Sequence, residues 1–278
     1  MTLKEAEARL LAAGIEDARA EARILFKKIG GLADYALVGI SAKCESAELE
    51  SALSRRERRE PLQYILGEAD FYRECYKVTP DCLIPRSDTE ILVDYAVKNL
   101  PRGGRFLDLC CGSGCVGISV LNNTEATECV SLDISSAAVA LTIENAQGIG
   151  VADRLTALCA DVTSPEHINL ITEKSQKFSA VLSNPPYVTS RAYEGLAPEI
   201  FHEPKAAFVG GEDGMDFYRA ITPMYKELIE QEGFIAYEIG YDQAELIRSV
   251  AEENQMTCRV INDLSGNPRV AIFRNPKN

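Results

Sequence analysis

The chain has 278 residues, enough for one large and one small domain, and 46% of them are hydrophobic, which supports a substantial core. A net charge of -13 argues against direct nucleic-acid binding, because phosphates attract clustered cations. Nine cysteines without close C-x-x-C pairs indicate reduced thiols rather than a zinc module. The N-terminus lacks the apolar core of a signal peptide and no run is long enough for a membrane span, so we expect a soluble, cytoplasmic protein.

Residues 1–62 are predicted to form a small all-helical domain. Thr2 and Glu5 have the spacing of a capping box in front of a first helix. A second helix-forming run ends at a pair of glycines, and a third begins at Ser46 and stops at Pro61. The third run carries an arginine cluster interleaved with glutamates, which we interpret as a solvated face with local ion pairs. Its members are Arg55, Arg56, Arg58 and Arg59.

Residues 63–86 are predicted to form a β-hairpin that joins two domains. Aromatic and β-branched residues in "FYRECYKVTPDCLIP" flank the turn sequence Thr79-Pro80-Asp81. Ser87 and Glu90 then have the spacing of a second capping box, which predicts a helix at the start of the next domain.

Residues 87–278 are predicted to form an α/β domain. Short apolar runs alternate with helical stretches, which implies right-handed crossovers and a parallel sheet covered on both faces. The predicted fold is therefore a doubly wound Rossmann-like sheet preceded by the small helical domain and the hairpin. The expected strands are "RFLDLC", "ECVSLD", "LTALCA", "FSAVLS", "GFIAYEIG" and "PRVAIFR".

A glycine-containing turn follows the first of these strands. Gly112 and Gly114 allow a sharp turn and a close approach of the backbone to a ligand, although their spacing alone fits many strand-to-helix connections. Asp133 ends the next strand, where it could accept hydrogen bonds from a ribose diol, and Asp161 follows the third, where it could receive an adenine amine. Three consecutive strand ends thus predict an adenosine cleft. Asp108, inside the first strand, is expected to orient the turn or a cofactor amine.

The fourth strand ends in Asn184-Pro185-Pro186-Tyr187. The prolines have no N–H and a fixed φ, and they push Asn184 into an extended conformation, so the carbonyls at 184 and 185 remain free acceptors. The Asn184 amide oxygen is another acceptor, and the Tyr187 ring is a flat surface. Hydrogen bonds to fixed acceptors favour the pyramidal attacking form of an amino group on a planar conjugated carbon, which is transition-state stabilisation.

These residues resemble the amino-group methyltransferases that use S-adenosylmethionine. The segment "PLQYILGEADFYRECYKVTPDCLIPRSDTEILVDYA", with "EPKAAFVGGEDGMDFYRAI" and "YEIGYDQ", resembles the HemK/PrmC family. That family methylates the glutamine N5 of the Gly-Gly-Gln loop in class 1 peptide chain release factors. The similarity extends from about residue 61 to residue 274 and implies S-adenosyl-L-methionine as cofactor and release factors as partners.

The resemblance also assigns site residues. It implies that Asn184, Pro185 and Tyr187 are catalytic and, with Pro186, bind the substrate. Cofactor binding is implied for residues in the glycine turn, at the next two strand ends and at the asparagine: Cys110, Cys111, Gly112, Ser113, Gly114, Asp133, Asp161, Val162 and Asn184. Docking of a release factor becomes a second interpretation of the arginine cluster.

Three departures from the family pattern predict weaker cofactor affinity rather than altered chemistry. Cys110-Cys111 replaces a usual Gly-Thr, Val162 replaces an aromatic residue that often follows the acid, and the Pro-Gly-Gly turn before the fifth strand is reduced to "EQEGF". We predict no metal site, since no histidine is close in sequence to Cys110, Cys111 and Cys115, and a redox-sensitive thiol in the turn is a minor hypothesis. Both His167 and His202 are expected at the surface.

Two alternative functions remain. A DNA methyltransferase acting on the exocyclic amine of adenine or cytosine shares the Asn-Pro-Pro-Tyr chemistry, but it needs a basic groove and a target-reading domain. The acidic charge and an N-terminal domain of only about 60 residues argue against it. A non-catalytic adenosine-binding module would keep the cleft without turnover.

Overall fold

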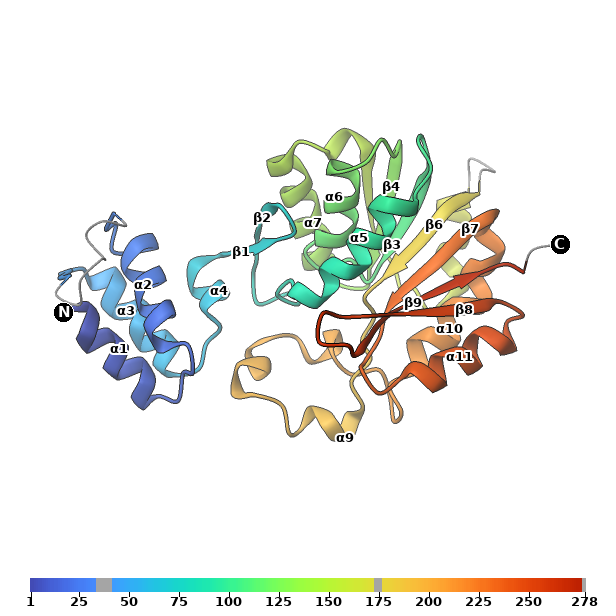
Figure 1. Ribbon diagram of the computed structural model, residues 1–278. Coiled ribbons are helices and arrows are strands. Elements are labelled where there is room, and N and C mark those ends of the chain that lie inside the picture. Colours follow the sequence, from blue (N-terminus) through green and yellow to red (C-terminus); the bar gives the residue numbers. More distant parts are fainter. Residues whose placement is uncertain (34–41, 173–176, 277–278) are drawn as a thin grey trace. The chain divides into compact units, whose positions relative to one another are not determined.

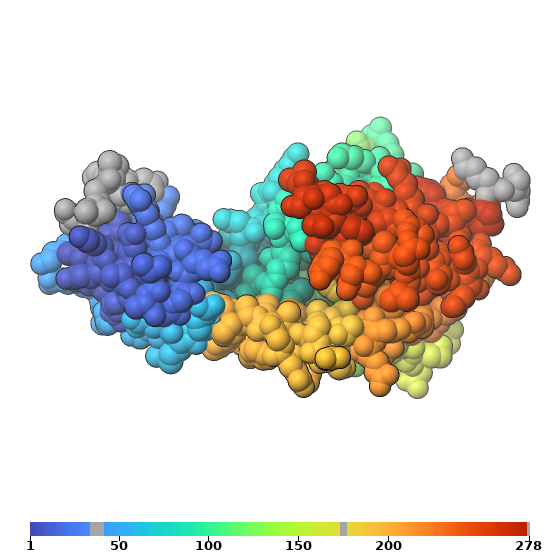
Figure 2. Space-filling model, turned by 60° about the horizontal axis from the view of Figure 1, so that its bottom comes forward, coloured from blue at the N-terminus to red at the C-terminus, as the bar shows by residue number. Residues whose placement is uncertain are grey.

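The fold is described by a computed structural model that covers residues 1–33, 42–172 and 177–276 (Figure 1). The chain divides into two units, the first made of Met1–Glu68 with Ala197–His202, and the second of Ala69–Leu196 with Glu203–Asn278. The residues of each unit pack into a continuous body (Figure 2). Within the ranges described, no helix is long and apolar enough to cross a membrane. The predicted domain limits at 62 and 86 stay a prediction.

The first unit is built from short helices around an apolar core. The capping box at Thr2 is confirmed, because Thr2 Oγ1 accepts from the Glu5 N–H at 3.2 Å while the Glu5 carboxylate accepts from the Thr2 N–H at 2.7 Å. Ser46 caps the third helix by accepting from the Leu49 N–H at 3.1 Å. The helices are α1 (Leu3–Ala12), α2 (Ala18–Lys28), α3 (Ala47–Glu57) and α4 (Leu62–Leu66).

One member of the arginine cluster on α3 is buried, so the interpretation as a solvated face is wrong at that position. The Arg56 side chain is 6% exposed and forms ion pairs with Glu21 at 2.6 Å and Glu199 at 3.0 Å. Arg59 also pairs with Glu199, at 2.8 Å. Local pattern could not reveal this, because Glu199 is 143 residues further along the chain and reaches α3 through the segment 197–202.

The hairpin is present, but its turn is not where the sequence suggested. Strands β1 (Glu68–Phe71) and β2 (Glu74–Lys77) are joined at Tyr72 and Arg73, ahead of the Thr-Pro-Asp sequence. Tyr72 has a φ of 58°, a conformation that is uncommon for a residue with a side chain and that propensity does not forecast.

The second predicted capping box is wrong for a related reason. Residues Ser87–Thr89 form a short 3₁₀ turn ahead of α5 (Glu90–Asn99) without a side-chain cap. The Glu90 carboxylate instead accepts from the Tyr72 N–H of the hairpin, at 2.8 Å. The Glu90 carboxylate, which the capping-box spacing predicted to accept from the Ser87 N–H, is therefore used in a tertiary contact with the hairpin.

The second unit contains a seven-stranded sheet in the order β5-β4-β3-β6-β7-β9-β8. The first five strands in this order are parallel, but β9 is antiparallel to both β7 and β8. The doubly wound α/β fold is confirmed, whereas the purely parallel sheet is corrected to a mixed one. The strands are β3 (Arg105–Leu109), β4 (Glu128–Asp133), β5 (Leu155–Cys159), β6 (Phe178–Ser183), β7 (Ile229–Glu238), β8 (Thr257–Asn262) and β9 (Pro268–Arg274).

Side chains of the central strands point alternately to the two faces of the sheet, and each face carries an apolar cluster. In β6, Val181 joins one apolar cluster, and Ala180 and Leu182 join the other. Helices α10 and α11 cover the first face, and α5, α6 and α7 cover the second (Figure 1). The helices not yet given bounds are α6 (Cys115–Asn122), α7 (Ser136–Ile149), α8 (Ile168–Thr172), α9 (Ser190–Tyr193), α10 (Asp216–Tyr225) and α11 (Ala244–Glu253).

His167 is buried, contrary to the expectation of a surface position. Its side chain lies within 2.6 Å of the Tyr225 hydroxyl, measured from Nε2, and burial lowers the pKa of its imidazole. The imidazole therefore packs as a neutral ring beneath α10.

Candidate active site

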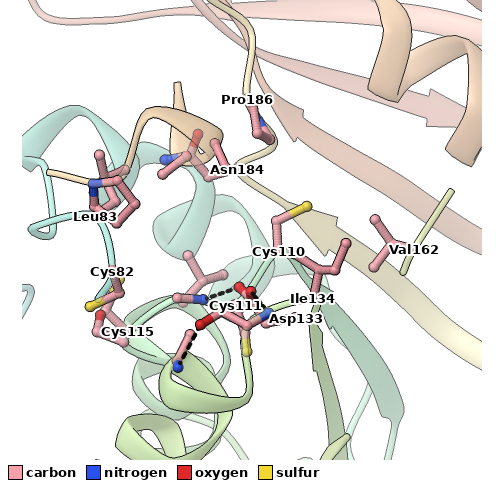
Figure 3. Close-up of a pocket in the computed structure, with 18 of the residues that line it drawn as sticks. Cys82, Leu83, Cys110, Cys111, Cys115, Asp133, Ile134, Val162, Asn184 and Pro186 are labelled. Atoms are coloured by element: carbon pink, nitrogen blue, oxygen red, sulfur yellow. Dashed lines mark hydrogen bonds between the residues drawn. The ribbon is translucent and has the colours of Figure 1, made fainter. Parts of the chain in front are cut away.

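A cavity of about 320 Å³ lies in the second unit where the central parallel strands end. Four of its walls come from the segments that follow β3, β4, β5 and β6, which is the usual ligand-binding edge of an open α/β sheet. Cys110, Ile134 and Val162 border the cavity from three of these segments, and Asn184 and Pro186 border it from the fourth (Figure 3). The sequence-derived strand ends therefore converge.

The glycine turn after β3 adopts left-handed backbone at alternate positions. The φ angles are 59° at Cys110, 55° at Gly112 and 79° at Gly114. For a residue with a Cβ this conformation costs about 1–2 kcal/mol, so Cys110 keeps a glycine-like backbone under strain. A Cβ at Gly114 would also lie 2.8 Å from side-chain atoms of Ile118 and Thr142. The turn thus needs glycine at 114 for two independent reasons.

Side chains of α7 hold the carbonyl groups of this turn. Thr142 Oγ1 donates to the Gly112 carbonyl at 3.0 Å, and Asn145 Nδ2 donates to the Ser113 carbonyl at 2.9 Å. The Asp133 carboxylate accepts from the Gly112 N–H at 2.9 Å and from the Ser135 N–H at the same distance. Ser135, and not Asp133, caps α7, which leaves the second lone pairs of the Asp133 oxygens for a ligand.

The cavity fits an adenosine group. Burial raises the pKa of Asp133, but its two backbone hydrogen bonds favour the ionised form. The carboxylate could accept hydrogen bonds from the two hydroxyls of a ribose. Next to Asp133 in sequence, the apolar side chain of Ile134 is exposed and lines the cavity, where a flat ring could pack on it. Val162 lies near Ile134 in Figure 3, and Asp161, adjacent in sequence, also lines the cavity.

Asp108 is not among the cavity-lining residues, although it supports the turn from below. Its carboxylate is 1% exposed and accepts from the Gly117 N–H in the first turn of α6, at 2.9 Å. Burial raises its pKa to about 7. The expectation that Asp108 orients the turn agrees with this contact, and no geometry places it near a cofactor amine.

Four cysteines line the cavity, but burial makes their thiols unreactive as nucleophiles. Burial raises the pKa of Cys82 to about 12 and raises the thiol pKa of Cys110, Cys111 and Cys115 further. Because the thiolate is the reactive form, these thiols are poor nucleophiles at neutral pH. Across the described ranges, no group of three or more potential ligands could hold a metal ion.

Asn184 and Pro186 line the cavity, whereas Pro185, Tyr187 and Gly114 do not. In the described part of the chain, no hydrogen bond is recorded to the main-chain carbonyl of Asn184 or Pro185, so both remain acceptors. The Tyr187 hydroxyl donates to Glu238 at 3.2 Å, and the ring packs against the core on the α10 side of the sheet. The ring therefore belongs to the packed core and does not line the cavity.

Sequence reasoning missed several functional candidates between 81 and 89. Cys82, Leu83, Pro85, Arg86 and Thr89 all line the cavity. The signal that could have found them is the sequence "PRSDTE" at residues 85–90, within the segment that resembles the HemK/PrmC family. It is held in place by the buried Glu203 carboxylate, which accepts from the Ile84 N–H at 2.9 Å and pairs with Arg86.

The comparisons with known proteins agree with this geometry. Residues 2–67 match the PrmC N-terminal domain, and residues 87–212 match the methyltransferase small domain. The chain is 36% identical to the release factor glutamine methyltransferase of Geobacter sulfurreducens over 239 residues, covering 84% of this chain and 81% of that protein. It is 34% identical to that of Caulobacter vibrioides over 280 residues, covering 98% and 94%.

A solved structure supports the fold. The ribosomal protein L11 methylase from Lactobacillus delbrueckii subsp. bulgaricus has a TM-score of 0.50 at 14% identity, covering 69% of this chain and 81% of that one. The sheet order, the glycine turn and the acid-bordered cleft define a Rossmann-like, S-adenosylmethionine-dependent methyltransferase. Within that class, the chain belongs to the HemK/PrmC family of release factor glutamine methyltransferases.

Proposed function

We propose that this protein transfers a methyl group from S-adenosyl-L-methionine to the side-chain amide nitrogen of the glutamine in the Gly-Gly-Gln loop of class 1 release factors. The observation that carries this proposal is the set of unengaged acceptors after β6, namely the side-chain oxygen of Asn184 and the main-chain carbonyls of Asn184 and Pro185, beside the cavity at the strand ends. Full-length similarity to release factor glutamine methyltransferases supports the choice of substrate.

The acceptors at 184 and 185 bind both N–H bonds of the substrate amide. An amide nitrogen is a weak nucleophile because its lone pair is delocalised, and two fixed acceptors favour its pyramidal form. The prolines keep these acceptors at fixed positions, so little reorganisation accompanies the reaction. Orientation of the amide against the methyl donor supplies the remaining rate enhancement, which can reach about 7–11 kcal/mol in favourable cases.

The glycine turn from Cys110 to Gly114 and the side chains of Asp133, Asp161 and Val162 would hold the cofactor, which when bound would supply an electrophilic sulfonium methyl and keep the electron pair of its C–S bond. The amide nitrogen would lose one proton after accepting the methyl group. The acceptors that hold its N–H bonds are neutral carbonyls, so no general base is required if the proton leaves after transfer.

The proposal includes the setting of the reaction. The helical domain at 1–62 recognises the release factor, the linker at 63–86 connects it, and residues 87–278 carry out methyl transfer. The substrates of the proposed reaction belong to the translation machinery, which supports a cytoplasmic location.

The experiment incubates the protein and labelled cofactor with a class 1 release factor, or with the same factor carrying Gln→Glu in its Gly-Gly-Gln loop. We expect label on the first and none on the second. Equal labelling of both would exclude the glutamine assignment. Cofactor binding without labelling of either would favour a non-catalytic adenosine-binding module, and label on DNA would favour the base-modifying alternative.

A further inference from the structure

The side chain of Asn184 poses a problem of direction. Its amide has an acceptor end and a donor end of nearly the same shape, so either could face the cavity. Only the carbonyl end can hold an N–H of the substrate, and a reversed amide would bring two donors together. The described residues include no protein hydrogen bond to Asn184 Oδ1, so the contact that sets the direction must lie on Nδ2.

That contact is Thr89. Asn184 Nδ2 donates to Thr89 Oγ1 at 3.1 Å, and Thr89 is 2% exposed. A hydroxyl alone does not select an amide orientation, because it could equally well donate to the oxygen of a reversed amide. The hydroxyl selects an orientation only if its own proton is held elsewhere.

Glu238 holds that proton. Thr89 Oγ1 donates to Glu238 Oε2 at 2.5 Å, and the carboxyl is 1% exposed at the end of β7. Its other oxygen accepts from the Tyr187 hydroxyl at 3.2 Å. Burial raises the pKa of Glu238 to about 7, while the two hydroxyl donors and the nearby positive charge of Arg269 oppose that shift. Above about pH 7 the carboxyl is therefore ionised and is an acceptor only. Thr89 is thereby left with lone pairs, and no proton, to offer Asn184.

We propose that Glu238, acting through Thr89, is a positioning residue that fixes the Asn184 amide with its oxygen toward the substrate nitrogen. The relay joins three segments: β7, the turn ahead of α5 and the end of β6. It gives Tyr187 a second function, since its hydroxyl completes the acceptor set of the carboxylate. This inference rests on the proposed methyl transfer, and it extends that function to residues that do not touch the substrate.

The first test compares Thr89→Val, which removes the hydroxyl but keeps the shape, with Thr89→Ser, which keeps the hydroxyl. Assays at about pH 8.5 ensure an ionised Glu238, whose pKa is raised to about 7 by burial. We expect Thr89→Val to lower kcat at least about tenfold, with the KM for release factor and the cofactor Kd changed less than about threefold. Thr89→Ser should retain most of the activity.

A matched control separates positioning from general loss of a buried hydroxyl. Thr222 is fully buried and hydrogen-bonded to the Tyr237 hydroxyl at 3.1 Å, on α10 and outside the cavity lining. Thr222→Val should lower the unfolding temperature by an amount similar to that of Thr89→Val, with kcat unchanged. An equal fall in kcat in both variants would overturn the proposal.

A double-mutant cycle with Asn184→Ala gives the sharpest readout. Asn184→Ala alone should reduce turnover by about two orders of magnitude. In that background Thr89→Val should cost less than about twofold, because no amide remains to be oriented. Equal costs of Thr89→Val in both backgrounds would show that Thr89 acts independently of Asn184 and would refute the relay.

Glu238→Gln tests the relay if Thr89→Val does not fold. A glutamine at 238 can donate to Thr89, which frees the hydroxyl proton and permits a reversed Asn184. We expect kcat to fall at least about tenfold without loss of cofactor binding. Unchanged kcat in a folded Glu238→Gln protein overturns the inference, whereas an inactive wild type would instead refute the proposed function.

Discussion

At the scale of single residues, three acidic side chains near the cofactor turn have different environments and therefore different roles. Asp133 accepts two backbone N–H groups and borders the cavity. Glu238 accepts two hydroxyls behind the asparagine. Asp108 accepts a single backbone N–H in a site that is 1% exposed. Asp108 has the fewest hydrogen-bond donors of the three to support a negative charge, so its titration should be visible in the stability of the protein.

We expect Asp108 to make the wild type less stable as pH rises. Burial raises its pKa in the folded state to about 7, above the ordinary value of 3.8, so the folded state binds the proton more tightly than the unfolded state. The stabilisation is complete below about pH 3.8 and is lost as pH rises through about 7. Asp108→Asn, a neutral isostere, lacks this loss. Chemical denaturation at about pH 5 and pH 8 should show that the free energy of unfolding of the wild type falls, relative to that of the variant, from the lower pH to the higher.

The contributions of other titrating groups to the pH dependence cancel in this comparison, because the wild type and Asp108→Asn both contain those groups. A difference between wild type and Asp108→Asn that is the same at both pH values would mean that Asp108 does not change its protonation on unfolding in this range. A fall in the opposite direction would mean that the folded protein stabilises the charged carboxylate.

Residue-scale prediction from the sequence succeeded where local chemistry was sufficient. Gly112, Asp133 and Asn184 were placed at strand ends by the apolar runs that precede them, and the structure brings all three to one cavity. Thr89 and Glu238 could not be found in this way. They join Asn184 through contacts that span 95 and 149 residues, and only the folding of the sheet places those segments together.

At the scale of elements, short apolar runs predicted every strand of the large sheet except β8. Strand β8 lies at the edge of the sheet, and its pattern of exposed and half-buried residues, "TCRVIN", gives little periodic signal. The hairpin turn was misplaced because Tyr72 and Arg73 are not typical turn formers. Short-range rules thus fail where a tertiary contact or an edge position decides the local conformation.

Helix α3 offers an element-scale prediction through its arginines. Arg56 is held by Glu21 and Glu199 in a site where 6% of the side chain is exposed, whereas Arg58, on the same turn region, is exposed. Removing one partner from a buried ion pair leaves uncompensated charge. We therefore expect Arg56→Ala to lower the free energy of unfolding of the helical unit by about 3 kcal/mol or more.

Arg58→Ala is the matched control and should change the same free energy by less than about 0.5 kcal/mol. Hydrogen exchange of the amides in α1, α2 and α3 measures the stability of this unit directly. Comparable loss of protection in the two variants would restore the original interpretation of the cluster as a solvated face.

At the scale of the whole molecule, the cavity-lining residues belong to only one of the two units, so the units should respond differently to the cofactor. The glycine turn, the acids at the strand ends and the asparagine all belong to the second unit. The first unit contributes helices and the segment 197–202, none of which lines the cavity. Binding of the cofactor should therefore increase the free energy of unfolding of the second unit.

We expect S-adenosylmethionine at about one hundred times its Kd to stabilise the second unit by about 2.7 kcal/mol. Hydrogen exchange should slow in β3 and β4, whose ends carry the glycine turn and Asp133, while α1 and α2 keep their free-protein rates. Gly114→Ala is the control, because its Cβ would press on Ile118 and Thr142 and force the turn away from its left-handed conformation. That variant should show no slowing at the same cofactor concentration. Equal slowing of hydrogen exchange in both units of the wild type would mean that the cofactor stabilises the molecule as one cooperative body. No slowing in either unit would mean that the cavity does not bind the cofactor, which would refute the proposed methyl transfer.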